Sequence, residues 1–231
     1  GDCQGLTHLN LAYNMIGDGG AFNLAGALGR CRSLSFLALG WNGIEAQGAA
    51  RLCAALGECD ALTHLDLRSN GIGDEGAARL AGVVTNCRGL SRLELGSNGI
   101  GNEGMQQLAG VLGACEMLTT VDLANNSISS GGAGWLAETL SRCHSLVHLD
   151  LGSNLIGDEG GLRLAAALVR SRALSLLDLR YNLLGEVGVR RLGGAFWRCA
   201  PLTFLDLRGN RPIGVGKLEK RKGYVVARSA P

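Results

Sequence analysis

The sequence has 231 residues and a formal net charge of +2, with 46% hydrophobic residues, 37 glycines and only 4% aromatic residues. This composition argues against one thick globular core and favours a thin, repetitive architecture. The near-neutral charge gives no case for a nucleic-acid-binding protein. The chain also lacks an apolar run of about 18 residues that could span a membrane.

Along the chain, one motif of the form LxxLxLxxNxI returns every 28 residues, eight times in all. Its alternating leucines predict a short strand in each unit, because successive side chains of a strand point to opposite faces. The first leucines are Leu6, Leu34, Leu62, Leu90, Leu118, Leu146, Leu174 and Leu202. The closing asparagines are Asn14, Asn42, Asn70, Asn98, Asn126, Asn154, Asn182 and Asn210.

A helical period follows the motif in the first seven units. Residues 71–84, GIGDEGAARLAGVV, carry apolar residues on one helix face, namely Ala77, Leu80, Ala81 and Val84. Just before this face, most units have a residue that can cap a helix, and we expect its side chain to accept hydrogen bonds from the first turn of that helix. These residues are Asp18, Asp74, Asn102, Ser130 and Asp158, with Ala46 and Glu186 as exceptions.

A single unit cannot bury its own leucines, so successive units are expected to stack into a solenoid with a shared core. The motif resembles the leucine-rich repeat. Its 28-residue step with IGDEGAxxLAxxL resembles the ribonuclease-inhibitor-like subclass, which also occurs in NOD-like receptors and in the Ran GTPase-activating protein. The resemblance implies an α/β fold, a right-handed horseshoe of eight 28-residue repeats with a concave parallel sheet and convex helices. It also implies an asparagine ladder whose buried amides satisfy backbone groups.

Two regions are predicted. Residues 1–210 form the leucine-rich-repeat array, which we interpret as a fragment of a longer array because the first unit begins in mid-repeat. After Asn210 the pattern ends, since Pro212 takes the place of the usual isoleucine. Residues 211–231 are expected to form an irregular C-terminal cap or a basic tail. This segment contains Lys217, Lys220, Arg221, Lys222, Tyr224, Val225 and Val226.

The cysteines follow the same repeat. Seven of the eight stand three residues before the first motif leucine, at Cys3, Cys31, Cys59, Cys87, Cys115, Cys143 and Cys199. Ser171 takes this place once, and Cys53 is out of step. A position that accepts serine favours a small buried thiol over a disulfide partner. We therefore expect reduced cysteines and a cytoplasmic protein, with redox sensitivity as an alternative role for the thiols.

The residues beside the inward leucines face the concave side, which is the candidate binding surface. One column there, the acidic column, comprises Asp66, Glu94, Asp122, Asp150, Asp178 and Asp206. Arginines placed to counter these charges are Arg68, Arg92, Arg180 and Arg208. Two interpretations remain open. The acids are either common surface residues of such repeats that keep the protein soluble, or a docking stripe for a partner with a basic face.

Aromatic residues lie toward the two ends of this surface and are either binding anchors or covers for the sheet edges. Three histidines, His8, His64 and His148, share one column. The nearest two are expected about 10 Å apart, too far for one metal ion. The candidate partner-binding residues are Phe36, Trp41, His64, Asp66, Arg68, Arg92, Glu94, Asp122, His148, Asp150, Asp178, Arg180, Tyr181, Phe204, Asp206 and Arg208.

We find no pattern that predicts catalytic residues, a cofactor or a metal, so an enzyme is not expected. The expected function is protein–protein interaction through the concave face, as in the sensing or scaffolding array of a NOD-like receptor. The partner is expected to be a protein and not a nucleic acid. The alternative is a regulator of an enzyme, either a ribonuclease-inhibitor-like inhibitor or a GTPase activator. Neither the ligand nor the oligomeric state follows from the sequence.

Overall fold

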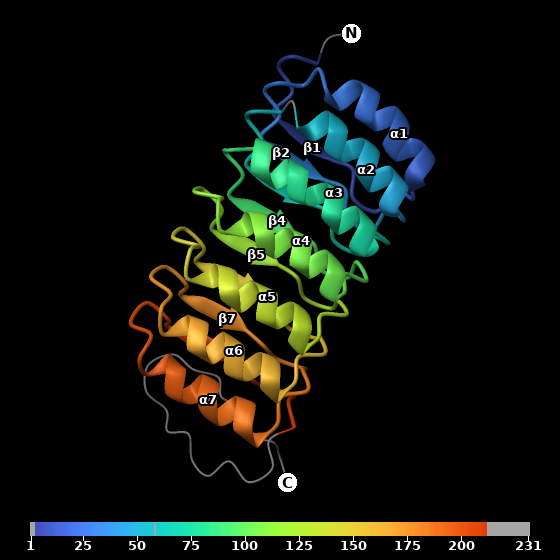
Figure 1. Cartoon of the computed structure of the whole chain (residues 1–231). Helices are drawn as coiled ribbons and strands as arrows, with labels where there is room; N and C mark the ends of the chain where they lie inside the picture. The colour runs from blue at the N-terminus through green and yellow to red at the C-terminus, as the bar shows by residue number, and fades with distance from the viewer. Residues whose placement is uncertain (1–2, 58, 212–231) are drawn as a thin grey trace.

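The computed structural model describes residues 3–57 and 59–211, within which eight strands alternate with seven helices (Figure 1). The strands are β1 (His8–Asn10), β2 (Phe36–Ala38), β3 (His64–Asp66), β4 (Arg92–Glu94), β5 (Thr120–Asp122), β6 (His148–Asp150), β7 (Leu176–Asp178) and β8 (Phe204–Asp206). The helices are α1 (Gly17–Leu28), α2 (Ala46–Leu56), α3 (Gly73–Asn86), α4 (Asn102–Leu112), α5 (Ser130–Leu140), α6 (Asp158–Leu168) and α7 (Glu186–Phe196). Each motif copy contributes one strand, as the alternation of its leucines predicts.

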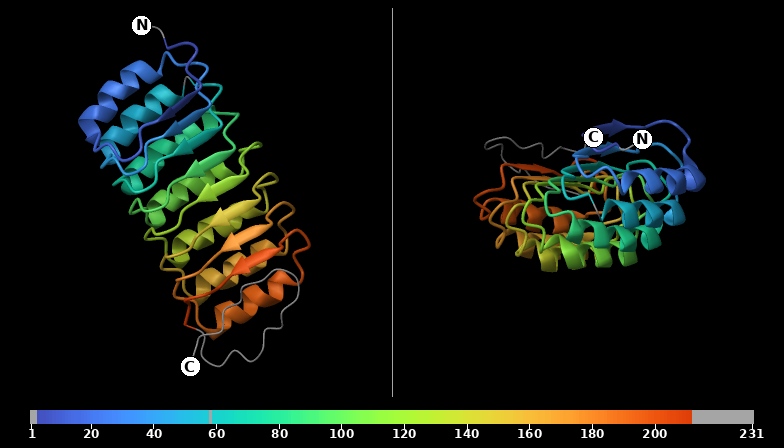
Figure 2. Two further views of the ribbon diagram at one scale, coloured as in Figure 1. Left: turned by 180° about the vertical axis from the view of Figure 1, so that it is seen from behind. Right: turned by 90° about the horizontal axis from the view of Figure 1, so that it is seen from above.

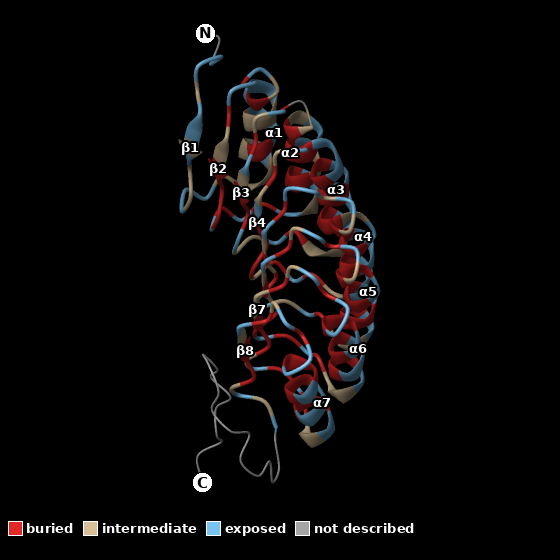
Figure 3. Ribbon diagram, turned by 90° about the vertical axis from the view of Figure 1, so that its left-hand side faces the viewer, coloured by how far each residue is buried: buried red, intermediate tan, exposed pale blue. Residues whose placement is uncertain are grey.

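All eight strands form one parallel sheet in the order β1 to β8 (Figure 2). The register is constant and places residues 28 positions apart side by side, as in the pairs Phe36 with His64 and Leu37 with Leu65. The helices form a second layer, in which each helix contacts the helix of the next unit. The sheet lies on the concave side and the helices on the convex side (Figure 3). The predicted α/β solenoid of stacked units is confirmed.

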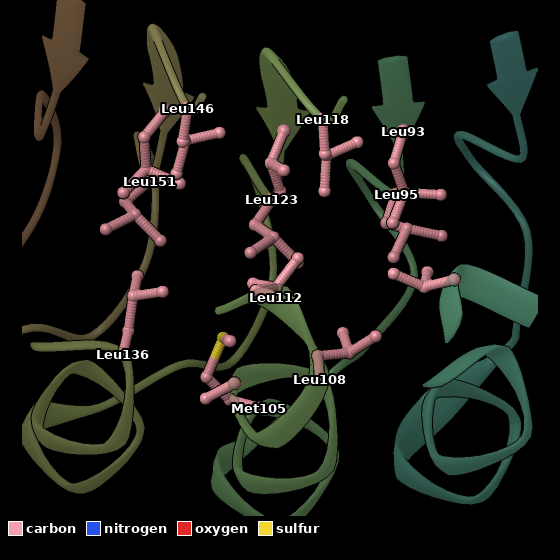
Figure 4. Close-up of a cluster of buried hydrophobic side chains, with 14 of the residues drawn as sticks. Leu93, Leu95, Met105, Leu108, Leu112, Leu118, Leu123, Leu136, Leu146 and Leu151 are labelled. Atoms are coloured by element: carbon pink, nitrogen blue, oxygen red, sulfur yellow. The ribbon is translucent and has the colours of Figure 1, made fainter. Parts of the chain in front are cut away.

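The core runs between the sheet and the helices along the whole array (Figures 3 and 4). Inward strand residues such as Leu93 and Leu95 share it with helix residues such as Leu108 and Met105, and all four are at most 1% exposed. Burial of one leucine side chain contributes roughly 1.5–3 kcal/mol, so each unit stabilises the units on either side of it. In the edge strand β1, Leu9 is only partly buried.

The closing asparagines form the predicted ladder. The side-chain Nδ2 of Asn154 donates to three carbonyls and its Oδ1 accepts from the amide of Ile128 at 3.0 Å. The three carbonyls belong to Leu123, Leu151 and Gly152. One amide thus joins two units. Asn98 differs from the other asparagines in the described residues, because its Nδ2 donates in the same way but its buried Oδ1 accepts no hydrogen bond.

The capping side chains act on a different helix from the one predicted. Asp74 at the start of α3 accepts with Oδ1 from the amides of Gly101 at 2.6 Å and Gly104 at 2.9 Å, at the start of α4. The expectation of a cap on the same helix is therefore wrong. The start of the next helix lies beside this carboxylate and offers first-turn amides that have no partner within α4. A Cβ at Gly104 would lie 2.6 Å from Asp74 Oδ1, so the cap requires glycine there.

The same arrangement recurs along the convex side. Asp158 of α6 accepts with Oδ1 from the amides of Gly185 at 2.8 Å and Gly188 at 2.7 Å, at the start of α7. Asp18 makes only one such bond, to the amide of Glu45 at 2.8 Å. These side chains tie neighbouring units together, as the asparagines do at the turns that precede the helices.

The predicted C-terminal cap or basic tail, residues 211–231, lies outside the described residues except for Arg211, and this includes Lys217, Lys220, Arg221 and Lys222. Within residues 3–57 and 59–211, every helix is too short or too polar to cross a bilayer.

Candidate functional site

The acidic column lies on the concave face, and most of its carboxylates fold back onto the backbone. An Oδ1 atom accepts from the amide two residues later in the chain, at 2.8–3.0 Å, in five units. The five aspartates are Asp66, Asp122, Asp150, Asp178 and Asp206. A short acceptor at this point closes the end of each strand, so the aspartates have a structural role in addition to any role in binding.

Arginines cover the column in its first part. Arg68 donates to Asp66 through Nε and Nη2 at 3.0 and 2.9 Å, and its Nε lies 3.0 Å from Glu94 Oε2. Arg92 donates to the other oxygen of Glu94. Asp66 and Glu94 are 7% and 3% exposed, so the expectation of a solvent-facing row is wrong here, because the guanidinium groups lie over the carboxylates. Burial favours the neutral form of Asp66, but the hydrogen bonds from Arg68 outweigh it and lower the pKa of this carboxyl.

The last three units are covered in the same way. Arg180 Nε lies 2.9 Å from Asp178 Oδ2, and its Nη2 lies 3.8 Å from Asp150 Oδ2. Arg208 donates to both oxygens of Asp206, which is 0% exposed. Asp178 is also buried, so it and Asp206 share the correction made for the first units. Burial raises the pKa of Asp178 to about 6, and the charge on Asp150 adds to the shift.

Asp122 differs from the rest of the acidic column. Among the described residues it has no arginine within ion-pair distance, although every other member of the column has one. Its Oδ1 accepts only from the amide of Ala124 at 2.9 Å, and its side chain is half-buried. Burial raises the pKa of Asp122, and the charges on Asp150 and Glu94 act in the same direction. The carboxylate is therefore left without a neutralising partner.

Aromatic rings gather at the N-terminal end of the concave face. Tyr13 and Trp41 stack with ring centroids 5.5 Å apart and planes at 12°, and both side chains are more than half exposed. Phe36 lies between His8 and His64, with centroid distances of 5.8 and 4.6 Å. Burial lowers the pKa of His64, so its imidazole favours the neutral form. The phenyl ring separates the two histidines.

A hollow of about 530 Å³ opens on the concave face over the first five units, and we call it the concave hollow. It brings together seven predicted residues: Phe36, Trp41, His64, Asp66, Arg68, Glu94 and Asp122. The other nine predicted residues do not line it: Arg92, His148, Asp150, Asp178, Arg180, Tyr181, Phe204, Asp206 and Arg208. Its volume lies in the range of roughly 300–1,000 Å³ that is usual for ligand pockets.

The small residues that open this hollow were not predicted. Ala12, Gly40, Gly96 and Ala124 line it. They belong to the column that carries Arg68 in the third unit, Gly152 in the sixth, and Arg180 and Arg208 in the last two. The run of small residues in the first five units was the signal in the sequence that this part of the surface is open.

The cysteines occupy the small slots that the repeat predicts for them. Cys31, Cys59, Cys87, Cys143 and Cys199 are buried, whereas Cys115 is half-buried and Cys3 is exposed. Burial raises the pKa of Cys53 to about 12 and that of Cys87 to about 11, so these thiols stay protonated at neutral pH. In the described part of the chain, no three His, Cys, Asp or Glu side chains are grouped to hold a metal ion.

Comparison with known families identifies the repeat. The family described as "Leucine Rich repeat" matches residues 2–25, 30–53, 61–81, 86–109, 114–137 and 142–165, which is more than half of the chain. This chain belongs to the leucine-rich repeat family. The seventh and eighth units of this leucine-rich-repeat protein keep the register of the matched ones, since β7 pairs with β6 and β8 in the same alignment. No curated protein matches the sequence.

Solved structures include the same fold. One of them is "Leiomodin-1 Actin-Binding Site 2 (ABS2)", which matches with a TM-score of 0.55 and 14% sequence identity. The match covers 67% of this leucine-rich-repeat protein and 88% of the leiomodin chain. At that identity the likeness concerns the fold alone.

Proposed function

We propose that this leucine-rich-repeat protein is a protein-interaction module that binds its partner on the concave face. The observation that supports this most strongly is the concave hollow, in which exposed rings of Tyr13 and Trp41 share one depression with the carboxylate of Asp122. Aromatic residues in pockets surrounded by polar groups are typical anchors of protein interfaces. The strands hold these residues at fixed spacing, so little conformational freedom is lost on binding.

Site-specific photo-crosslinking tests this proposal. A photoreactive amino acid at Ser69 or Ser97, which line the concave hollow, is expected to form adducts with the partner in cell extract. The same amino acid at Glu138, exposed on helix α5 of the convex side, serves as the matched control. Adducts that form equally at Glu138, or only there, would contradict binding through the concave face.

The kind of module is a finer proposal. The 28-residue step supports a sensing or scaffolding array of the NOD-like-receptor type within the ribonuclease-inhibitor-like subclass, and the alternative is an inhibitor or activator of an enzyme. Identification of the cross-linked partner separates them, because a regulator would change the catalytic rate of its partner and a scaffold would not. The buried cysteines support a reducing, cytoplasmic setting.

A further inference from the structure

We propose that the concave hollow binds a basic segment of the partner through two arginine side chains, one on the Asp122 carboxylate and one on the Tyr13–Trp41 rings. This inference rests on the proposed function and specifies the chemistry of the partner. It is drawn from charge, from available space and from a geometry that the protein itself repeats.

The charges that line the hollow do not balance. Three carboxylates, Asp66, Glu94 and Asp122, face one guanidinium, that of Arg68. Arg68 donates its hydrogen bonds to Asp66 and Glu94, so its charge only partly offsets that of Asp122 and it forms no ion pair with it. A half-buried carboxylate without a partner attracts a cation more strongly than an exposed one, because the surrounding dielectric is lower. The same charges repel phosphate groups and acidic peptides.

The protein shows three times how an arginine lies over an acid of this column. Arg68 covers Asp66, Arg180 covers Asp178 and Arg208 covers Asp206, in each case from the position two residues later. In the fifth unit the acid is Asp122 and the residue two positions later is Ala124. The unit therefore has the carboxylate of this pair but not the guanidinium, and we infer that the partner supplies it.

The neighbouring unit keeps the place open. Gly96 lines the hollow beside Asp122, and a Cβ at Gly96 would lie 3.2 Å from both carboxylate oxygens. Glycine thus leaves the carboxylate open to approach across the hollow. Gly40 and Ala12 leave the same column open beside the stacked rings of Tyr13 and Trp41, on the other side of Arg68.

The rings favour arginine over lysine. Tyr13 and Trp41 lie at turns with positive φ of 63° and 60°, a conformation that aromatic residues seldom adopt. The turns hold the stacked pair at the rim of the hollow, where one planar guanidinium can stack on the ring faces. A second one can bind Asp122, three strands away in the sheet, through two N–H groups.

A peptide titration followed by NMR tests the inference. The probe is a seven-residue peptide of glycine and serine with two arginines, and the matched probe has citrulline, a neutral isostere, in place of both arginines. The arginine peptide is expected to shift the Trp41 indole signal and to bind at least tenfold more tightly than the citrulline peptide. Asp122→Asn should remove most of this difference, and Trp41→Ala should weaken binding about fivefold.

The controls separate the possible outcomes. Asp178→Asn changes an acid of the same column that already has an arginine, so it should alter affinity less than twofold. Equal binding of the two peptides, no binding, or no effect of Asp122→Asn would overturn the inference. It would also be overturned if N-acetylarginine amide bound as tightly as the peptide, because the hollow would then be a small-molecule site. Concave cross-links at Ser69 would still support the proposed function in each of these cases.

Discussion

The two halves of the concave face share one motif but present different surfaces. In the half from β6 to β8, Arg180 and Arg208 lie over the acids and fill the surface. In the half from β1 to β5, Gly96 and Ala124 occupy the equivalent positions and the hollow opens beside Asp122. Both halves have the same core leucines and the same register. The column also holds Arg68 in the first half and Gly152 in the second, so the halves differ mainly at Asp122, which has no arginine, whereas Asp150 beside Gly152 is paired with Arg180.

The largest expected effect concerns the asparagine ladder, where the halves differ at Asn98 and Asn154. Asn154→Ala leaves three carbonyls and one amide without their partner and should lower the free energy of unfolding by about 3 kcal/mol. Asn98→Ala should cost about 1 kcal/mol less, because its Oδ1 accepts no bond. Urea denaturation of both variants measures the difference. Equal losses would show that the acceptor bond adds nothing.

The second prediction converts the first half into the second. Ala124→Arg places a guanidinium two residues after Asp122, as Arg180 stands after Asp178. It should change the free energy of unfolding by less than about 0.5 kcal/mol. Because the new side chain fills the hollow, it should weaken binding of the arginine peptide about 30-fold, or about 2 kcal/mol. The reverse change, Arg180→Ala, serves as the control and should leave peptide affinity within about twofold. Calorimetric titration with the arginine peptide measures both affinities. Similar losses of affinity in the two variants would contradict binding at Asp122.

The third prediction states where the halves are alike. Asp74→Ala and Asp158→Ala each remove an acceptor shared by two amides of the next helix, and each should cost about 1–1.5 kcal/mol. Asp18→Ala removes one such bond and should cost about half as much. Thermal denaturation checks the order. Clearly different losses for Asp74 and Asp158 would mean that the halves also differ on the convex side.

The smallest expected effect is a pH dependence of opposite sign at Asp178 in the second half and Asp66 in the first. The folded pKa of Asp178 is about 6, above its unfolded value, so the folded state binds more protons between about pH 4 and 6. Stability from this group is present at acidic pH and is lost as the pH rises through 6. The pKa of Asp66 is lowered, so its contribution is present at neutral pH and is lost on acidification.

Denaturation at pH 4.5 and pH 7 tests this contrast. On going from the lower to the higher pH, the free energy of unfolding of Asp178→Asn should rise by about 1 kcal/mol relative to that of the parent protein, after allowance for solvent screening. Asp66→Asn should follow the parent protein at these two values, because the contribution of Asp66 is lost only below about pH 4; at pH 3 the variant should gain stability relative to the parent. The assignment of Asp178 would be refuted if its variant followed the parent at both values.

Much of this protein follows from periodicity in one dimension. The constant 28-residue step from Leu6 to Leu202 predicts the strands and their register, because residues 28 positions apart occupy the same position in successive stacked units. The asparagine ladder also follows from the sequence, since a side-chain amide at a buried repeat position must form hydrogen bonds with neighbouring backbone groups. Some residues that line the concave hollow, such as Asp66 and Asp122, were also predicted, since they alternate with the inward leucines, but the small residues beside them were not.

The tertiary structure decided how neighbouring units share their side chains. Whether Asp74 caps its own helix or the next depends on the distance between stacked helices, which no single unit contains. Whether Asp122 is neutralised depends on arginines of other units, and whether a depression exists depends on several small residues that face it together. A repeat pattern determines what stands in each column, but the lateral distances between columns exist only once the units are stacked.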